Sequence, residues 1–137
     1  MKSKNNCHTY FKIIGDFNPS EISSILHLKP YQSWTKKDLR RDGKPFGFDL
    51  WEFGYENEYD PYVYTQMEKT VEELEKKVDA LNYIHEHFDV QFYLVVVPHV
   101  YAGGINPVLA PSMRIIDFCH ATRTKIDIDL YVYNEDD

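Results

Sequence analysis

Apolar positions along the chain divide it into strands and helices. The first strand is expected over residues 7–14, a run rich in β-branched and aromatic residues. A short helix should follow, because Asn18 can cap it, Pro19 suits its first turn and Glu21 completes a capping box. Pro30 is expected to end this helix, since the residue before a proline avoids the helical region.

Two strands around a tight turn are predicted between residues 31 and 56. The dipeptide Asp42-Gly43 tolerates the positive φ angles of a hairpin turn. Residues 49–55 form the second of these strands.

A long helix and a central strand are predicted next. Apolar residues recur every three or four positions from Thr65 to His87, which indicates a helix with one face packed on a sheet. The nearly continuous apolar run 90–97 is typical of a strand in the middle of a sheet. A third helix is expected over residues 111–121.

The last strand, residues 125–133, alternates between apolar and polar positions. Its even-numbered residues are expected to face the core, and its odd-numbered residues the solvent. The inward set is Ile126, Ile128, Leu130 and Val132.

The order of these elements predicts an α+β fold. It corresponds to a ferredoxin-like β-α-β-β-α-β unit extended by one α-β pair, a two-layer sandwich with a mainly antiparallel sheet and helices on one face. A chain of 137 residues has the size of one domain. We therefore expect a single domain over residues 1–137, with an ordered core of about 7–133.

Five segments of the sequence together suggest a family. They are Leu28-Lys29-Pro30, Ser33-Trp34-Thr35-Lys36, Trp51, the helical stretch 74–81 and Ile126-Asp127-Ile128-Asp129-Leu130-Tyr131. In this combination the chain resembles domain-of-unknown-function family 4279 from about residue 9 to 133, although Lys36-Lys37-Asp38 lacks the glycine of the usual pattern. The resemblance implies a small, mostly bacterial, stand-alone domain with no assigned activity, and it transfers no catalytic residue.

Charge and composition restrict the classes of partner. The formal net charge is -7 at pH 7, so the chain as a whole would repel the phosphate backbone of a nucleic acid. No apolar run approaches the ~20 residues that cross a bilayer, and the amino-terminal residues lack the apolar region of a signal peptide. Cys7 and Cys119 are too few for a disulfide framework and are expected to be buried thiols. We expect a cytoplasmic protein that binds neither nucleic acid nor membrane.

The predicted hairpin separates charge along the chain. Residues 36–44 carry a net charge of +3, whereas residues 49–64 carry -5 and are interleaved with aromatic side chains. Aromatic and arginine side chains are enriched where proteins recognise one another. The residues predicted to contact a partner are Trp34, Lys36, Lys37, Arg40, Arg41, Trp51 and Tyr55. The alternative is that Trp51 and Phe53 pack under the long helix and the charges form a solvated surface.

Two other groups of residues could carry chemistry. His99 and Tyr101 could present polar atoms to a pocket formed with the loop 100–111, which would suit a small ligand or a hydrolytic reaction. Asp127 and Asp129 project from the same face of a strand and are weak candidates for a metal site. No cofactor motif and no catalytic signature occurs in the sequence.

These patterns lead to a non-enzymatic protein-interaction module as the predicted function. An antitoxin-like or immunity role is an analogy based on the small, acidic chain. Helices on one face of a sheet leave the other face open, so both a monomer and a homodimer are consistent with the sequence.

Overall fold

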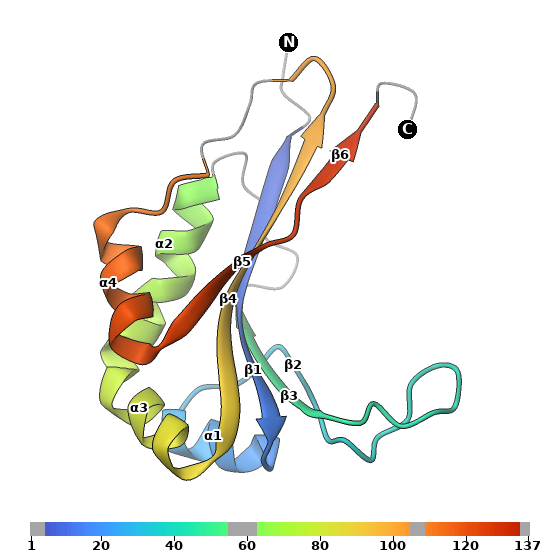
Figure 1. Cartoon of the computed structure of the whole chain (residues 1–137), viewed down its shortest axis with the longest axis vertical. Coiled ribbons are helices and arrows are strands. Elements are labelled where there is room, and N and C mark those ends of the chain that lie inside the picture. The colour runs from blue at the N-terminus through green and yellow to red at the C-terminus, as the bar shows by residue number, and fades with distance from the viewer. Residues whose placement is uncertain (1–4, 55–62, 105–108, 135–137) are drawn as a thin grey trace.

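A mixed, mostly antiparallel sheet with helices on one face forms the fold (Figure 1). The computed structural model describes residues 5–54, 63–104 and 109–134. Its strands are β1 (Asn6–Asp16), β2 (Gln32–Trp34), β3 (Asp49–Gly54), β4 (Asp89–Tyr101), β5 (Thr124–Ile128) and β6 (Tyr131–Tyr133). Its helices are α1 (Pro19–Leu26), α2 (Val63–Leu74), α3 (Val78–His87) and α4 (Met113–Thr122), with the 3₁₀ turn η1 (Glu75–Lys77) between α2 and α3. The predicted α+β class is confirmed.

The strand order is β2-β3-β1-β4-β5, and β6 also pairs with β4. β1 pairs antiparallel with both β3 and β4, whereas β5 and β6 run parallel to β4. The apolar run of β4 therefore lies inside the sheet, as its sequence predicted. β2 and the β5–β6 segment form the two edges.

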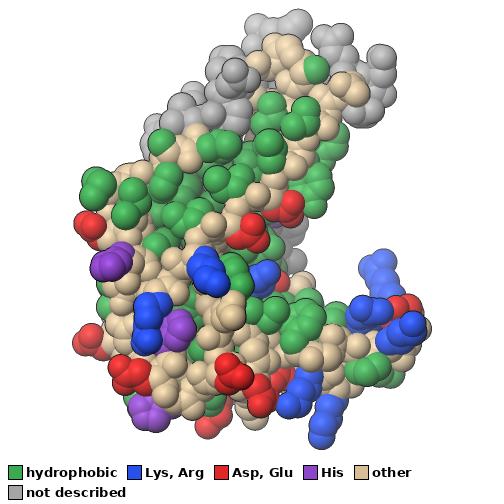
Figure 2. Space-filling model, viewed as in Figure 1, with side chains coloured by type: hydrophobic (Ala, Val, Ile, Leu, Met, Phe, Trp, Pro, Cys, Tyr) green, Lys and Arg blue, Asp and Glu red, His purple; other side chains and the backbone are tan. Residues whose placement is uncertain are grey.

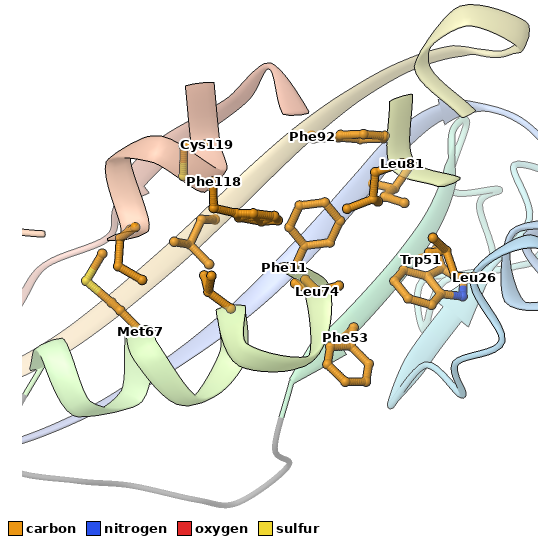
Figure 3. Packing of buried hydrophobic residues seen from close by; sticks show 14 of the residues in the cluster. Phe11, Leu26, Trp51, Phe53, Met67, Leu74, Leu81, Phe92, Phe118 and Cys119 are labelled. Carbon is orange, nitrogen blue, oxygen red and sulfur yellow. The ribbon is translucent and has the colours of Figure 1, made fainter. Parts of the chain in front are cut away.

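The core lies between the sheet and the helices (Figure 3). Phe11 of β1 and Phe92 of β4 meet edge to face with ring centroids 5.4 Å apart. Alternate residues of each strand point to this side, because side chains of a strand project to opposite faces in turn. The largest fully buried side chains are Trp51, Phe11, Phe92, Ile13, Ile22, Leu26, Leu50, Leu74, Leu81, Ile84, Leu94 and Ile115.

Helix α1 begins as predicted but ends earlier. The side chain of Asn18 accepts a hydrogen bond from Ser20 N at 3.1 Å, which caps the helix in front of Pro19. The helix ends at Leu26 rather than near Pro30, because His27 adopts a left-handed conformation with φ 53°. A left-handed residue closes a helix by turning its backbone N–H back onto the last turn.

The long helix of the sequence prediction is divided in two. It is already helical at Val63, so Thr65 lies inside α2 and does not cap it. The turn η1 then separates α2 from α3 at residues Glu75, Lys76 and Lys77. All three are charged and none is buried, so packing does not hold this turn in α-helical geometry. The predicted end at His87 is confirmed.

The last strand differs most from its prediction. Ile126, Ile128, Leu130 and Val132, expected in the core, are between 37% and 66% exposed. They lie on the edge segment β5–β6, and only Thr124 at its start is buried beneath α4. An alternating pattern shows that a strand has two faces, but it does not show whether a helix covers the apolar one.

Pro98 explains why the edge segment is two strands. The carbonyl of Val96 accepts from Asp129 N at 2.8 Å, so the backbone of Val96 points toward the edge. Backbone groups alternate in direction along a strand, so Pro98 should point the same way, but it has no N–H to donate. The ladder breaks there and resumes in the same register, with Tyr131 opposite His99.

Candidate functional site

The loop 35–48 between β2 and β3, here called the basic arm, projects from the sheet away from the helices (Figure 1). Asp49 fastens its base. One carboxylate oxygen of Asp49 accepts from Lys36 N at 2.7 Å, and the other accepts from Phe17 N at 2.8 Å. Asp49 is buried, and these hydrogen bonds connect the arm to the end of β1.

Three aromatic rings support the arm. Trp34 stacks on Phe46 with centroids 4.0 Å apart and meets Phe48 edge to face at 5.7 Å. All three side chains are half-buried. Trp34, predicted to contact a partner, therefore gives most of its ring surface to holding the arm in shape.

The end of the arm is a two-stranded ribbon closed by the predicted turn. Leu39 and Pro45 form a β-bridge, and Arg40 N donates to the carbonyl of Lys44 at 2.8 Å. The carboxylate of Asp42 accepts from the guanidinium of Arg40 and from Lys44 N. These bonds hold the pKa of Asp42 below its usual value. Gly43, with φ 82°, completes the turn.

The basic side chains of the arm fall into two groups. Lys36 pairs with Asp16 and Arg40 pairs with Asp42, so these two charges stabilise the arm itself. Within the described residues, Lys37, Arg41 and Lys44 form no ion pair and are exposed. Figure 2 shows several Lys and Arg side chains gathered on the arm, which projects from the rest of the molecule. These three cations are therefore available to a partner.

An apolar side chain lies between these cations. Leu39 is 66% exposed near the end of the arm. Leu39 was not among the residues predicted to contact a partner, although a leucine flanked by charged residues in a predicted hairpin indicates an exposed apolar side chain. An exposed apolar side chain that lies between Lys37 and Arg41 along the chain suits an acidic surface with an apolar depression.

A shallow open hollow of about 370 Å³ lies at the base of the arm. Its lining residues are Asp16, Phe17, Asn18, Thr35, Lys36, Lys37 and Asp49. The carboxylates of Asp16 and Asp49 are engaged by Lys36 and by backbone N–H groups. The hollow is therefore part of the arm's attachment.

Trp51 and Tyr55 do not join the arm as surface residues. Trp51 is 0% exposed, and its indole N–H donates to Ser23 Oγ at 3.0 Å inside the core. The side chain of Trp51 faces the helical side of β3. Its burial agrees with the alternative prediction, in which Trp51 packs under the helices. Tyr55 lies outside the described residues.

The sheet face opposite the helices carries an aromatic and histidine cluster, with His99 at its centre. His99 stacks on Tyr131 at 5.2 Å and on His8 at 5.8 Å, and its Nδ1 lies 2.9 Å from the hydroxyl of Tyr133. Tyr101 stacks on Tyr133 at 4.8 Å. His99 and Tyr101 are thus on an open sheet face, and residues 105–108 of the loop predicted to complete their pocket lie outside the described residues.

Asp127 and Asp129 lie beside this cluster on the edge segment. The hydroxyl of Tyr131 donates to Asp129 at 3.3 Å, and burial, Glu52 and both carboxylates raise the pKa of Tyr10 to about 12. In residues 5–54, 63–104 and 109–134, no group of three or more His, Cys, Asp or Glu side chains is placed to hold a metal ion. No helix in these ranges is both long enough and apolar enough to span a bilayer.

Glu52 provides a test of the electrostatics of this open face. It is 7% exposed and accepts from the hydroxyl of Tyr31, and burial raises the pKa of its carboxyl above the usual value. A carboxyl whose pKa is raised on folding destabilises the fold as the pH rises above the ordinary glutamate pKa. We expect Glu52→Gln to melt at a higher temperature than the native chain at neutral pH, and the difference to shrink near pH ~4.

Thermal denaturation at both pH values measures this difference. Glu72→Gln, on the exposed side of α2, is the control and should change little. If Glu52→Gln is instead less stable at neutral pH, the ionised carboxylate is a net stabiliser through Tyr31 and Lys12, its neighbour on β1.

Comparison with protein families finds a match over nearly the whole chain. A family model described as "Domain of unknown function (DUF4279)" matches residues 5–133. No curated protein and no solved structure matches the chain. The function is therefore argued from the side chains of this chain alone.

Proposed function

The chain belongs to the DUF4279 family of domains of unknown function, and we propose that it is a non-enzymatic protein-interaction module that binds an acidic partner protein through its basic arm. The observation that carries this proposal is the group formed by Lys37, Arg41 and Lys44, exposed cations on an arm held by its own hydrogen bonds. A preorganised surface binds without first losing the entropy of a disordered loop.

Charge separation supports a protein partner of acidic character. The arm carries +3 on a chain of -7, so the rest of the molecule repels the same partner that the arm attracts. Repulsion elsewhere favours one docking orientation and disfavours others. An antitoxin-like or immunity role is one setting in which such a module would act, by analogy with small acidic proteins of that kind.

The small-ligand or hydrolytic alternative depends on a cavity beside His99. His99 is stacked among Tyr131, Tyr133 and His8 on the sheet face opposite the helices, and its Nδ1 lies 2.9 Å from the hydroxyl of Tyr133. These placements favour the interaction module. Basic arms also bind nucleic acids, and nuclease treatment distinguishes a nucleic-acid ligand from a protein partner.

We expect Arg41→Glu with Lys44→Glu to abolish partner capture without lowering the melting temperature, because neither side chain contributes an ion pair within the described fold. Arg40 is left intact, since reversing it would place two carboxylates beside each other at the turn. Tagged native and variant proteins are incubated with lysate, and the captured proteins are identified by mass spectrometry and tested again in purified form.

The matched control is Lys29→Glu with Lys77→Glu, which changes the net charge equally on other parts of the surface. It should retain capture, and capture by the native chain should weaken with added salt. Equal capture by the two double variants would overturn the proposal. Loss of capture after nuclease treatment would identify a nucleic-acid ligand and reject a protein partner.

For the fold, we infer that β1 to β4 with their helices form a ferredoxin-like unit, extended by α4, β5 and β6. Support comes from the strand order β2-β3-β1-β4, in which all neighbouring strands are antiparallel.

The cytoplasmic location stays a prediction. It is supported by Cys7 and Cys119, which are both buried and not joined in a disulfide.

A further inference from the structure

The edge segment β5–β6 is an exposed, apolar sheet edge. Most of the large hydrophobic side chains exposed in the described structure lie on it or on the adjoining helix α4; these are Met113, Ile116, Ile126, Ile128, Leu130, Tyr131 and Val132. In Figure 1, β5 crosses in front of the sheet. Figure 2 is seen from the same side and shows hydrophobic side chains gathered over this region. Proteins usually protect edges with short strands, prolines or a covering helix, and the opposite edge, β2, has only three residues.

The backbone of β5 is ready to accept another strand. Asp129 N donates to β4, and backbone direction alternates along a strand, so Lys125 and Asp127 also turn toward β4. The N–H and C=O groups of Ile126 and Ile128 therefore point away from the sheet. Residues 124–133 contain no proline that would block pairing.

We propose that β5 docks a second copy of this chain: the two β5 strands pair antiparallel about a twofold axis at Ile126 and join two sheets into one. In this arrangement the outward backbone groups of Ile126 in each copy bond to each other. Thr124 of one copy lies opposite Ile128 of the second copy, and Lys125 lies opposite Asp127 of the second copy.

Charge complementarity selects both the second copy and this register. Lys125 and Asp127 project from the open face of β5, next to Tyr93 and Val95 of β4. The twofold pairing at Ile126 produces two Lys125–Asp127 pairs between the copies. The next register in one direction places two Lys125 side chains opposite each other, and the next in the other direction places two Asp127 side chains opposite each other. Like charges directly opposite destabilise a sheet.

On the helical face, the pairing covers exposed apolar surface. Ile126 meets Ile126 of the second copy, and Ile128 lies beside it. Arg114 of α4 binds Glu68 and Glu75, which places it toward α2. Ile116 follows Arg114 by two residues, so it points roughly to the opposite side of the helix, above the free edge. The helix thus adds an apolar contact to the joined strands.

Pairing through β5 leaves the basic arms free to bind. The basic arm follows β2, at the edge of the sheet opposite to β5, so the dimer leaves both arms uncovered. A dimer with two arms binds a partner with two sites more tightly than one arm does, because the second contact is intramolecular. This inference does not depend on what the arms bind.

A charge-swap experiment tests the pairing. Sedimentation of the native full chain should show a dimer. Lys125→Asp alone and Asp127→Lys alone each place two pairs of like charges across the axis, and each should raise the dissociation constant about 30-fold. An equimolar mixture of the two variants should form a dimer again, because the new carboxylate at position 125 faces the new amine at position 127, and native Lys125 faces native Asp127.

Thermal melting confirms that each variant is folded, and Lys29→Asp, the same charge change elsewhere, should remain dimeric. If both charge variants fail to fold, Ile116→Lys, on the outer side of α4, is used and should weaken the dimer. A native chain that sediments as a monomer at all concentrations overturns the proposal. So does a mixture that stays monomeric, and so does dimerisation unaffected by Lys125→Asp. Capture of the acidic partner by the same edge variants is measured separately. Loss of the dimer can then be told apart from loss of binding by the basic arm.

Discussion

Replacing Asp49 by alanine should lower the free energy of unfolding by about 3 kcal/mol and release the basic arm from the body. The buried carboxylate accepts backbone hydrogen bonds from Phe17, just after β1, and from Lys36, just after β2. It therefore joins two segments that lie beyond the ends of their strands. Alanine leaves both donors without this acceptor, and the N–H of Phe17 is in a buried position. Partner capture should fall as well, because the arm would lose its fixed geometry.

Urea denaturation measures the loss of stability, and amide hydrogen exchange at Lys36 and Gly47 measures the release of the arm. Asp38→Ala is the matched control, since Asp38 is exposed and its carboxylate accepts from Thr35 N at 2.8 Å, a bond within the arm itself. We expect it to cost less than about 1 kcal/mol. Equal losses for the two variants would mean that Asp49 does not fasten the arm.

Local patterns in the sequence predicted the elements that depend on neighbouring residues. The cap at Asn18, the turn at Asp42-Gly43 and the central position of β4 depend on side chains within a few residues or on a long apolar run, and the structure agrees with each. The end of α1 at His27 was not predicted, because a histidine in a left-handed conformation has no sequence signature comparable to that of glycine.

Features that depend on distant segments were not predictable from one strand at a time. All residues of β3 from Asp49 to Phe53 are buried, so its sequence could not show which side faces the helices. Trp51 was therefore assigned to a partner surface as well as to the core. The exposed side chains of β5, such as Ile128, reflect the position of α4 relative to the sheet edge, which no local pattern encodes.

The arm itself was predicted only in part. The cluster of Lys and Arg residues was visible in the sequence, and the structure separates it into Lys36 and Arg40, which stabilise the arm, and the cations that remain exposed. That division depends on Asp16, twenty residues from Lys36 along the chain. The role of Asp49 was missed for the same reason, since its two donors lie 13 and 32 residues away.

Trp51→Ala should cause the larger loss of stability, about 4 kcal/mol. The indole is 0% exposed, stacks with Phe53 at 6.1 Å and lies next to Leu26 of α1 (Figure 3). Alanine would leave a cavity between β3 and α1 and would remove the hydrogen bond to Ser23 Oγ. Urea denaturation measures the loss, and Trp51→Phe, which keeps a ring in the core, should lose about 2 kcal/mol.

Partner capture by Trp51→Phe separates the two roles that the sequence suggested for this residue. A core residue contributes to binding only through the fold, so Trp51→Phe should capture the partner as well as the native chain does at a temperature where both are folded. In a Ser23→Ala background, the further loss of stability caused by Trp51→Phe should be smaller, because the indole N–H then has no Ser23 hydroxyl to bind. Loss of capture in a folded Trp51→Phe variant would contradict the core assignment. It would require the indole to become accessible when the partner binds, which the packing of Trp51 between Phe53 and α1 opposes.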